Sequence, residues 1–173
     1  MSAAAELTPQ SPATHTISLF VNNAPGVLVR VALVFSRRGF NIESLVVSPG
    51  AEGRFSRMTI TCSGAPDVLE QIIKQLAKLI DVVHAIDHTS DSSYETEIAL
   101  IKTESALDAR TEILQIAEHF KARVVDYGSD SMILQAYGSS DKLDALIDLL
   151  RPYSITELVR SGKLLMARGK RPT

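Results

Sequence analysis

The sequence from position 15 to position 48 reads HTISLFVNNAPGVLVRVALVFSRRGFNIESLVVS, and this stretch decides the fold. Residues 15–22 place Ile, Leu and Val at every second position, which is typical of a half-buried β-strand. The turn NAPG at 23–26 separates this strand from a segment whose apolar residues recur at helical spacing until Gly39. Residues 42–48 are again rich in β-branched side chains. The stretch therefore predicts a strand, a helix and a second strand.

The order of elements continues along the chain and then repeats. Strands are expected at 55–62, 82–87, 97–103, 122–127, 131–137 and 155–160, with one more at 163–168, and helices after Pro66, Ser105 and Ser140. Ser105 with Asp108 is interpreted as a capping box, Ser140 as the cap of the last helix, and Pro152 as its end. Each half has the order βαββαβ, the ferredoxin-like pattern. The predicted fold class is α+β, with two tandem ferredoxin-like domains.

Composition along the chain predicts the domain boundaries. Residues 1–14 are rich in Ala, Ser, Thr and Pro and are interpreted as a disordered N-terminal tail. The first domain is expected at 15–88, and a polar linker at 89–94. The C-terminal ferredoxin-like domain is expected at 95–169, followed by a solvated tail at 170–173.

Composition and charge argue against several classes of function. The chain has 173 residues, a formal net charge of −2 and a pI near 6.1, so we expect neither a nucleic acid nor a membrane as partner. There is no secretory signal and no apolar run of the roughly 20 residues that a membrane helix needs, which predicts a cytoplasmic protein. The single cysteine, Cys62, is interpreted as a core residue. The histidines lack metal-ligand spacing and no catalytic motif is present, so we expect no metal, cofactor or catalytic residue in this chain.

The strand at 41–48 has a particular consequence for assembly. In the ferredoxin-like topology it lies at the edge of its sheet. It is apolar on much of both faces, and no Lys or Pro guards it. An unguarded edge strand tends to pair with another chain. We therefore predict a homodimer in which two such strands meet.

The turn at 23–26 is the candidate ligand site. The N-terminus of a helix carries unpaired N–H groups and a positive dipole end, which suit a carboxylate. Gly26 lets a ligand approach the backbone, and the amides of Asn23 and Asn41 offer acceptors for an ammonium group. A zwitterionic amino acid needs both, and Val27, Leu28 and Ile42 could shape a small aliphatic pocket. The other interpretation is an ordinary turn with a helix cap.

Several motifs carry a resemblance to a known family. The segment NAPGVLVRV at 23–31 resembles the loop and first helix of ACT domains. The resemblance becomes more specific in RRGFNIESL at 37–45, SRMTI at 56–60, LEQIIKQLAKL at 69–79, KLDAL at 142–146 and RSG at 160–162. Together these segments are similar to the small subunit of acetolactate synthase, over roughly residues 14–169.

The resemblance implies a regulatory subunit without an active site. It implies that residues 15–88 form an amino-acid-sensing ACT domain, and that the chain activates a separate catalytic subunit containing thiamine diphosphate, Mg and FAD. It also implies feedback inhibition by valine or another branched-chain amino acid. The implied site lies between two chains and is formed by Asn23, Gly26, Val27 and Leu28 of one chain with Asn41 and Ile42 of the other.

Two alternatives remain open at this point. The chain could be a generic amino-acid-binding ACT regulator of another enzyme. Arg54, Arg57 and Met58 could contact the catalytic subunit, or they could be ordinary strand surface.

Overall fold

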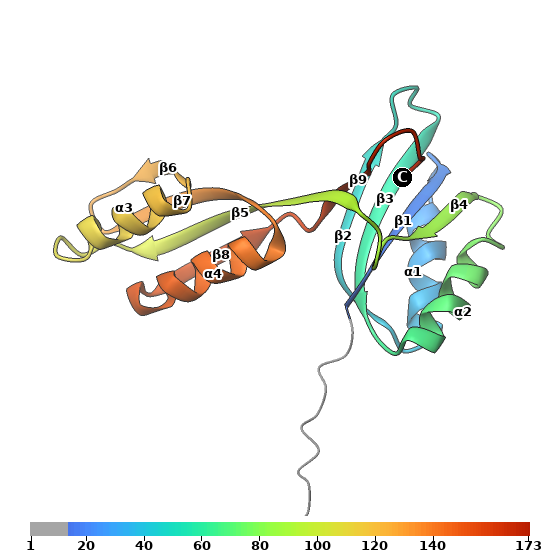
Figure 1. The fold of residues 1–173 in the computed structure, drawn as a ribbon, viewed down its shortest axis with the longest axis horizontal. Helices are drawn as coiled ribbons and strands as arrows, with labels where there is room; N and C mark the ends of the chain where they lie inside the picture. The colour runs from blue at the N-terminus through green and yellow to red at the C-terminus, as the bar shows by residue number, and fades with distance from the viewer. Residues whose placement is uncertain (1–13) are drawn as a thin grey trace, which may run out of the picture.

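The computed structural model describes residues 14–173. The predicted N-terminal tail lies outside the described residues except for Thr14, which already belongs to the first strand. Two α+β units follow one another along the chain, and Figure 1 shows them as two lobes joined by a long strand. The predicted fold class, two tandem ferredoxin-like βαββαβ domains, is confirmed.

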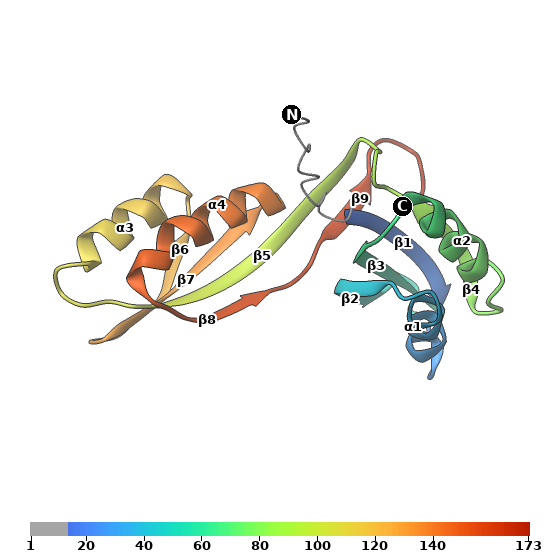
Figure 2. The same ribbon diagram turned by 90° about the horizontal axis from the view of Figure 1, so that it is seen from below.

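The first unit contains four antiparallel strands in the order β2-β3-β1-β4. Its elements are β1 (Thr14–Asn22), α1 (Val27–Arg37), β2 (Asn41–Pro49), β3 (Phe55–Ser63), α2 (Pro66–Leu76) and β4 (Val82–Asp87). Both helices cover the same face of the sheet (Figure 2). The period-two pattern of the first strand explains this packing, because Ile17, Leu19 and Val21 all point to the helices and are buried. As predicted, β2 is an edge strand.

The second unit repeats this topology in the sheet order β6-β7-β5-β8. Its elements are β5 (Ser93–Glu104), α3 (Arg110–His119), β6 (Arg123–Tyr127), β7 (Ser131–Gly138), α4 (Ser140–Leu150), a short 3-10 helix (Arg151–Tyr153), β8 (Ile155–Arg160) and β9 (Leu164–Ala167). Ala99, Ile101 and Leu134 belong to its core, which is separate from the core of the first unit.

The two predicted caps of the second unit are wrong in detail. Helix α3 begins at Arg110 rather than near Ser105, and its N-cap residue is Ala109. The buried Ser105 Oγ makes no hydrogen bond within the described residues, so the predicted capping box does not form. The N-cap of α4 is Ser139, whose Oγ accepts a hydrogen bond from Lys142 N at 3.4 Å. Ser140 Oγ donates instead to Glu97 Oε1 at 2.5 Å.

Strand β5 has two parts that pair with different strands. Residues 93–96 pair with β9, whereas residues 97–104 pair with β7 and, in part, with β8. The predicted linker at 89–94 therefore ends earlier than expected, since its last two residues already form strand. Figure 2 shows β5 running from one lobe to the other.

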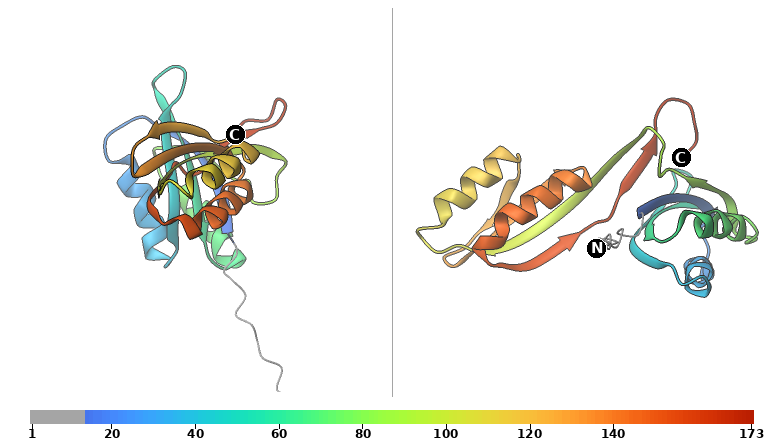
Figure 3. Two further views of the ribbon diagram at one scale, coloured as in Figure 1. Left: turned by 90° about the vertical axis from the view of Figure 1, so that its left-hand side faces the viewer. Right: turned by 60° about the horizontal axis from the view of Figure 1, so that its bottom comes forward.

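The chain end returns to the first unit instead of extending into solvent. Thr173 is 5% exposed, and its carbonyl oxygen accepts a hydrogen bond of 2.5 Å from Arg57 Nη1. His84 Nε2 lies 3.1 Å from the same oxygen. The prediction of a solvated tail at 170–173 is wrong for Thr173, because these contacts hold it against the sheet face that the helices leave free (Figure 3). None of the helices between residues 14 and 173 is both long and apolar enough to cross a membrane.

Candidate functional site

The N-terminus of α1 is open to an anion. Gly26 is the N-cap residue and has φ +81°, a left-handed conformation that favours glycine. No side chain caps this helix, and no acidic residue lies in its first turn. The positive end of the helix dipole is therefore not neutralised by a capping group.

The turn before α1 is held by the hairpin between β2 and β3. Asn23 N donates to the Arg54 carbonyl at 2.9 Å, and Asn23 Nδ2 donates to the Gly53 carbonyl at 2.9 Å. Since the amide nitrogen is engaged in this way, the side-chain oxygen is the part of Asn23 best placed to accept a hydrogen bond from an ammonium group.

The two apolar residues after Gly26 have different environments. Val27 is 2% exposed and belongs to the core of the first unit, so only its backbone can face a ligand. Leu28 is 43% exposed and points outward. The aliphatic contact predicted for both side chains is therefore available from Leu28 alone.

Asn41 and Ile42 lie at the other end of the sheet. In the ladders of β3, Asn22 is opposite Phe55, whereas Asn41 is opposite Ser63. The length of β3 separates these ends by about 25 Å. Asn41 is exposed and Ile42 is partly buried against the core. One chain thus does not bring the six predicted residues together, and a site containing all of them requires a second chain.

The three residues considered for contact with a partner protein differ in exposure. Met58 is buried among the residues of the first core, so its side chain is not available to a partner, and this part of the prediction is wrong. The period-two alternation of β3 turns it toward the helices. Arg57 lies over the Phe20 ring at 5.6 Å and binds Thr173. Arg54 is exposed and lies over the Phe55 ring at 5.1 Å.

Residues 14–173 contain no cluster of His, Cys, Asp or Glu side chains that could hold a metal ion. The only cysteine, Cys62, is buried in β3. Burial, together with the negative charges of Glu43 and Asp87, raises the pKa of its thiol to about 11. The thiolate that nucleophilic chemistry needs is therefore scarce at neutral pH.

An ion network around the buried carboxylate of Glu97 in the second unit was not found from the sequence. Glu97 accepts hydrogen bonds from Arg160 Nη2 at 2.6 Å and Nε at 2.9 Å, and Arg160 Nη1 binds Asp144 at 2.5 Å. Burial lowers the pKa of Arg160, but the hydrogen bonds to Glu97 and Asp144 outweigh this effect and the net direction is upward. The alternation of β5 was the available signal, because it places Glu97 on the same face as the core residue Ala99.

The fold and the open helix end define the class of protein. The sheet order, the two helices on one face and the glycine at the N-terminus of α1 are those of an ACT domain, and residues 17–84 match the family described as "AHAS small subunit-like ACT domain". Residues 96–169 match "Small subunit of acetolactate synthase".

Similar proteins extend this match over most of the chain. A probable acetolactate synthase small subunit of Archaeoglobus fulgidus is 47% identical over 157 residues, which cover 91% of this chain and 98% of the relative. The acetolactate synthase small subunit of Mycobacterium leprae is 43% identical, covering 91% and 94%. The crystal structure of the small subunit from Thermotoga maritima is 34% identical, covers 91% of this chain and 99% of that chain, and gives a TM-score of 0.81. The chain belongs to the family of acetolactate synthase small subunits.

Proposed function

We propose that this chain is a regulatory subunit that activates the catalytic subunit of acetolactate synthase and makes it sensitive to valine. One observation carries the amino-acid part of the proposal: the N-terminus of α1 has no capping side chain, and a glycine stands at its N-cap. A carboxylate would accept hydrogen bonds from the first-turn N–H groups and interact favourably with the helix dipole.

The remaining groups fit the other parts of an amino acid. The Asn23 side-chain oxygen would accept from the ammonium group, and Leu28 would contact an aliphatic side chain. Asn41 and Ile42 would complete the site from a second chain, since within one chain they lie at the far end of the sheet. The proposed site is therefore located at the interface of a homodimer.

Edge strand β2 supports the homodimer. Its outer edge has no strand neighbour in the described chain, and Val47 of this strand is exposed. Pairing with β2 of a second chain would satisfy the free backbone groups and cover this side chain. Replacing Val46 with Lys is expected to shift the mass measured by light scattering toward the monomer. A dimer of unchanged stability would contradict pairing through β2.

Regulation follows from binding between chains. Valine bound at the interface would favour one arrangement of the dimer over another, and it can shift that equilibrium only by its difference in affinity for the two arrangements. A coupling free energy of about 1–3 kcal/mol is typical of such systems. The chain itself would contribute no catalytic residue. Thiamine diphosphate, Mg and FAD would belong to the catalytic subunit, in the cytoplasm.

Reconstitution tests the proposal directly. Acetolactate formation by the catalytic subunit of the same organism would be measured with and without this chain, and with and without valine. We expect activation by the chain and reversal of that activation by valine. Activation without a valine effect would point to another ligand, with leucine and isoleucine tested next. No activation would contradict the proposed partner and leave a regulator of another enzyme.

A further inference from the structure

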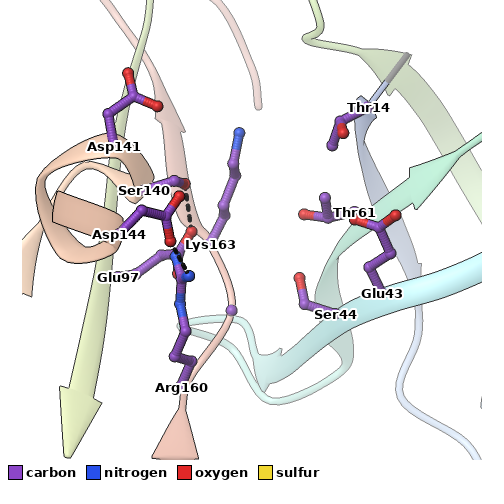
Figure 4. A pocket seen from close by; sticks show the side chains of 11 residues that line it. Thr14, Glu43, Ser44, Thr61, Glu97, Ser140, Asp141, Asp144, Arg160 and Lys163 are labelled. Atoms are coloured by element: carbon purple, nitrogen blue, oxygen red, sulfur yellow. Dashed lines mark hydrogen bonds and ion pairs between the residues drawn. The ribbon is translucent and has the colours of Figure 1, made fainter. Parts of the chain in front are cut away.

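A cleft of about 490 Å³ lies between the two units, far from the N-terminus of α1. Figure 4 shows Thr14, Glu43, Ser44 and Thr61 on the side of the first unit. The other side is formed by Glu97, Ser140, Asp141, Asp144 and Arg160 of the second unit, together with Lys163 of the connection between β8 and β9. Gly162 lets this connection pass close to β2, since a Cβ atom there would lie 2.9 Å from Ser44 Oγ.

The two cations of the cleft are already paired. Arg160 binds Glu97 and Asp144, and Lys163 Nζ lies 2.9 Å from Glu95 Oε2 and 3.2 Å from Thr16 Oγ1. Glu43 and Asp141 have no ion pair in the described part of the chain. The cleft therefore carries excess negative charge, with one uncompensated carboxylate from each unit, and a cationic group would be favoured there.

A second observation points to a ligand on the side of the first unit. Thr61 is 7% exposed and lines the cleft, but its Oγ1 atom is buried without a hydrogen-bond partner within residues 14–173. Such an atom costs free energy unless a partner is supplied. Thr61 is opposite Ser44 in the β2–β3 ladder, so the two hydroxyl groups lie on the same sheet face.

Glu43 is brought to the same place by an irregularity of the edge strand. The register between β2 and β3 shifts between Ile42 and Ser44, so Glu43 is the extra residue of a β-bulge. A bulge redirects the side chain of its extra residue, and Figure 4 shows the Glu43 carboxylate beside Thr61. One carboxylate and two hydroxyl groups thus line the same side of the cleft.

We propose that this cleft binds the primary ammonium group of a small organic molecule. An ammonium group has three N–H donors, and Glu43, Ser44 and Thr61 offer three acceptors. A metal ion is a poor alternative, because no group of three metal-ligating side chains is found in the part of the chain described here. The ammonium could belong to a diamine, whose second charge would face Asp141, or to an amino acid.

The ligand would act on the relation between the two units. Both units line the cleft, and Glu43 and Asp141 repel one another across it. A cation between them removes this repulsion and favours the arrangement in which the cleft is closed. This cleft uses other residues than the amino-acid site proposed at the N-terminus of α1, although Glu43 and Ser44 directly follow Asn41 and Ile42 in β2.

Isothermal titration calorimetry on the full chain tests the proposal with 1,4-diaminobutane and, separately, with glycine. We expect saturable binding of at least one of the two, and the comparison between them distinguishes a diamine from an amino acid. Glu43→Gln and Thr61→Val should each weaken that binding by about tenfold, the loss expected for one hydrogen bond to a charged group. Glu52→Gln, the same charge change in an exposed turn, should leave it unchanged within twofold.

Three outcomes would overturn the proposal. These are no saturable binding of either probe, equal affinity in the cleft variants and the wild type, or a loss equally large in Glu52→Gln. If a variant fails to fold, the proposal can still be tested on the wild-type chain by measuring its amide chemical shifts. Addition of the binding probe should shift the signals of Ser44 and Thr61, and shifts confined to the N-terminus of α1 would contradict the cleft.

Discussion

The two units share one topology but differ in the sheet face that their helices leave free. In the first unit this face carries polar residues, yet Thr16, Ser18 and Thr59 are buried. The segment after β4 and the chain end cover it through contacts such as the 2.8 Å hydrogen bond between Ser18 Oγ and His88 Nε2. In the second unit the corresponding face carries Tyr137 and Val159, which are about 60% exposed.

The same fold therefore treats the sheet face opposite its helices in two ways. The first unit is finished by its own chain, whereas the second unit leaves apolar side chains in solvent. Their helix ends differ as well. Among the α-helices of residues 14–173, α1, α2 and α3 begin without a side-chain cap and α4 is capped by Ser139, but α1 alone has a glycine as its N-cap residue. The open glycine end of α1 suits a ligand, and the capped end of α4 serves stability.

The largest effect is expected from Gly26→Asp. The new carboxylate would repel the carboxylate of an amino acid at the α1 end, and it could pair with Arg30, whose Nη1 would lie 3.1 Å from the added Cβ. We expect the valine response of the reconstituted enzyme to be lost while activation is kept. An allosteric coupling of this kind typically corresponds to a change in affinity of about 5- to 150-fold, and this change should disappear. Inhibition assays would measure this.

Gly169→Asp is the matched control for that prediction. Gly169 has a similar positive φ of +73°, but nothing lies within 4 Å of its position. Its valine response should equal that of the wild type. An unchanged valine response in Gly26→Asp, or an equal loss of that response in Gly169→Asp, would mean that the N-terminus of α1 has no special role in the valine response.

Gly162→Ala tests how firmly the two units are joined. A Cβ atom would lie 2.9 Å from Ser44 Cβ, and the φ of +79° is unfavourable for alanine. We expect a loss of about 1–3 kcal/mol in the free energy of unfolding and a change in small-angle scattering. Gly169→Ala adds a similar backbone strain without the contact, so the two variants separate strain from the clash. Equal scattering curves would mean that the units do not depend on this contact.

Ser18→Ala tests the covered face of the first sheet. It leaves the buried His88 Nε2 without its partner, and the free energy of unfolding should fall by about 1–2 kcal/mol. Chemical denaturation would measure it. Loss of less than a few tenths of a kcal/mol would show that water reaches this face in solution.

Val159→Lys is expected to have the smallest effect. Because Val159 is exposed on the free face of the second sheet, the change in the free energy of unfolding should stay within about 0.5 kcal/mol. The same denaturation experiment compares it with Ser18→Ala. A loss larger than 1 kcal/mol would mean that the face is covered in solution, and the contrast between the two sheets would disappear.

Local patterns were sufficient for most of the fold. The alternation of Ile17, Leu19 and Val21 predicted a half-buried strand, and the strand at 41–48 was predicted at the edge of its sheet. What they could not predict were contacts between segments distant along the chain. Thr173 was expected in solvent because nothing near it in sequence indicates a partner, yet it packs on Arg57 and His84.

The candidate site, too, could be predicted only where its chemistry depends on neighbouring residues in the sequence. Gly26 and Asn23 could be proposed from the turn, because the chemistry of a helix N-terminus is local. The burial of Val27 and Met58 depends on which way each side chain turns in the folded unit. The cleft between the units was missed because Glu43 and Asp141 come from different domains, and no pattern in the sequence relates them.

The double membership of β5 limits how this family can change in length. Side chains alternate between faces along a strand, so inserting one residue between Thr96 and Glu97 would turn one half of β5 over relative to the other. The buried Ala99 and Ile101 would then exchange places with the outward-facing Ile98 and Leu100, unless the ladder with β9 inverted instead. Insertions at this point should therefore be accepted in pairs, a parity rule that an ordinary flexible linker would not impose.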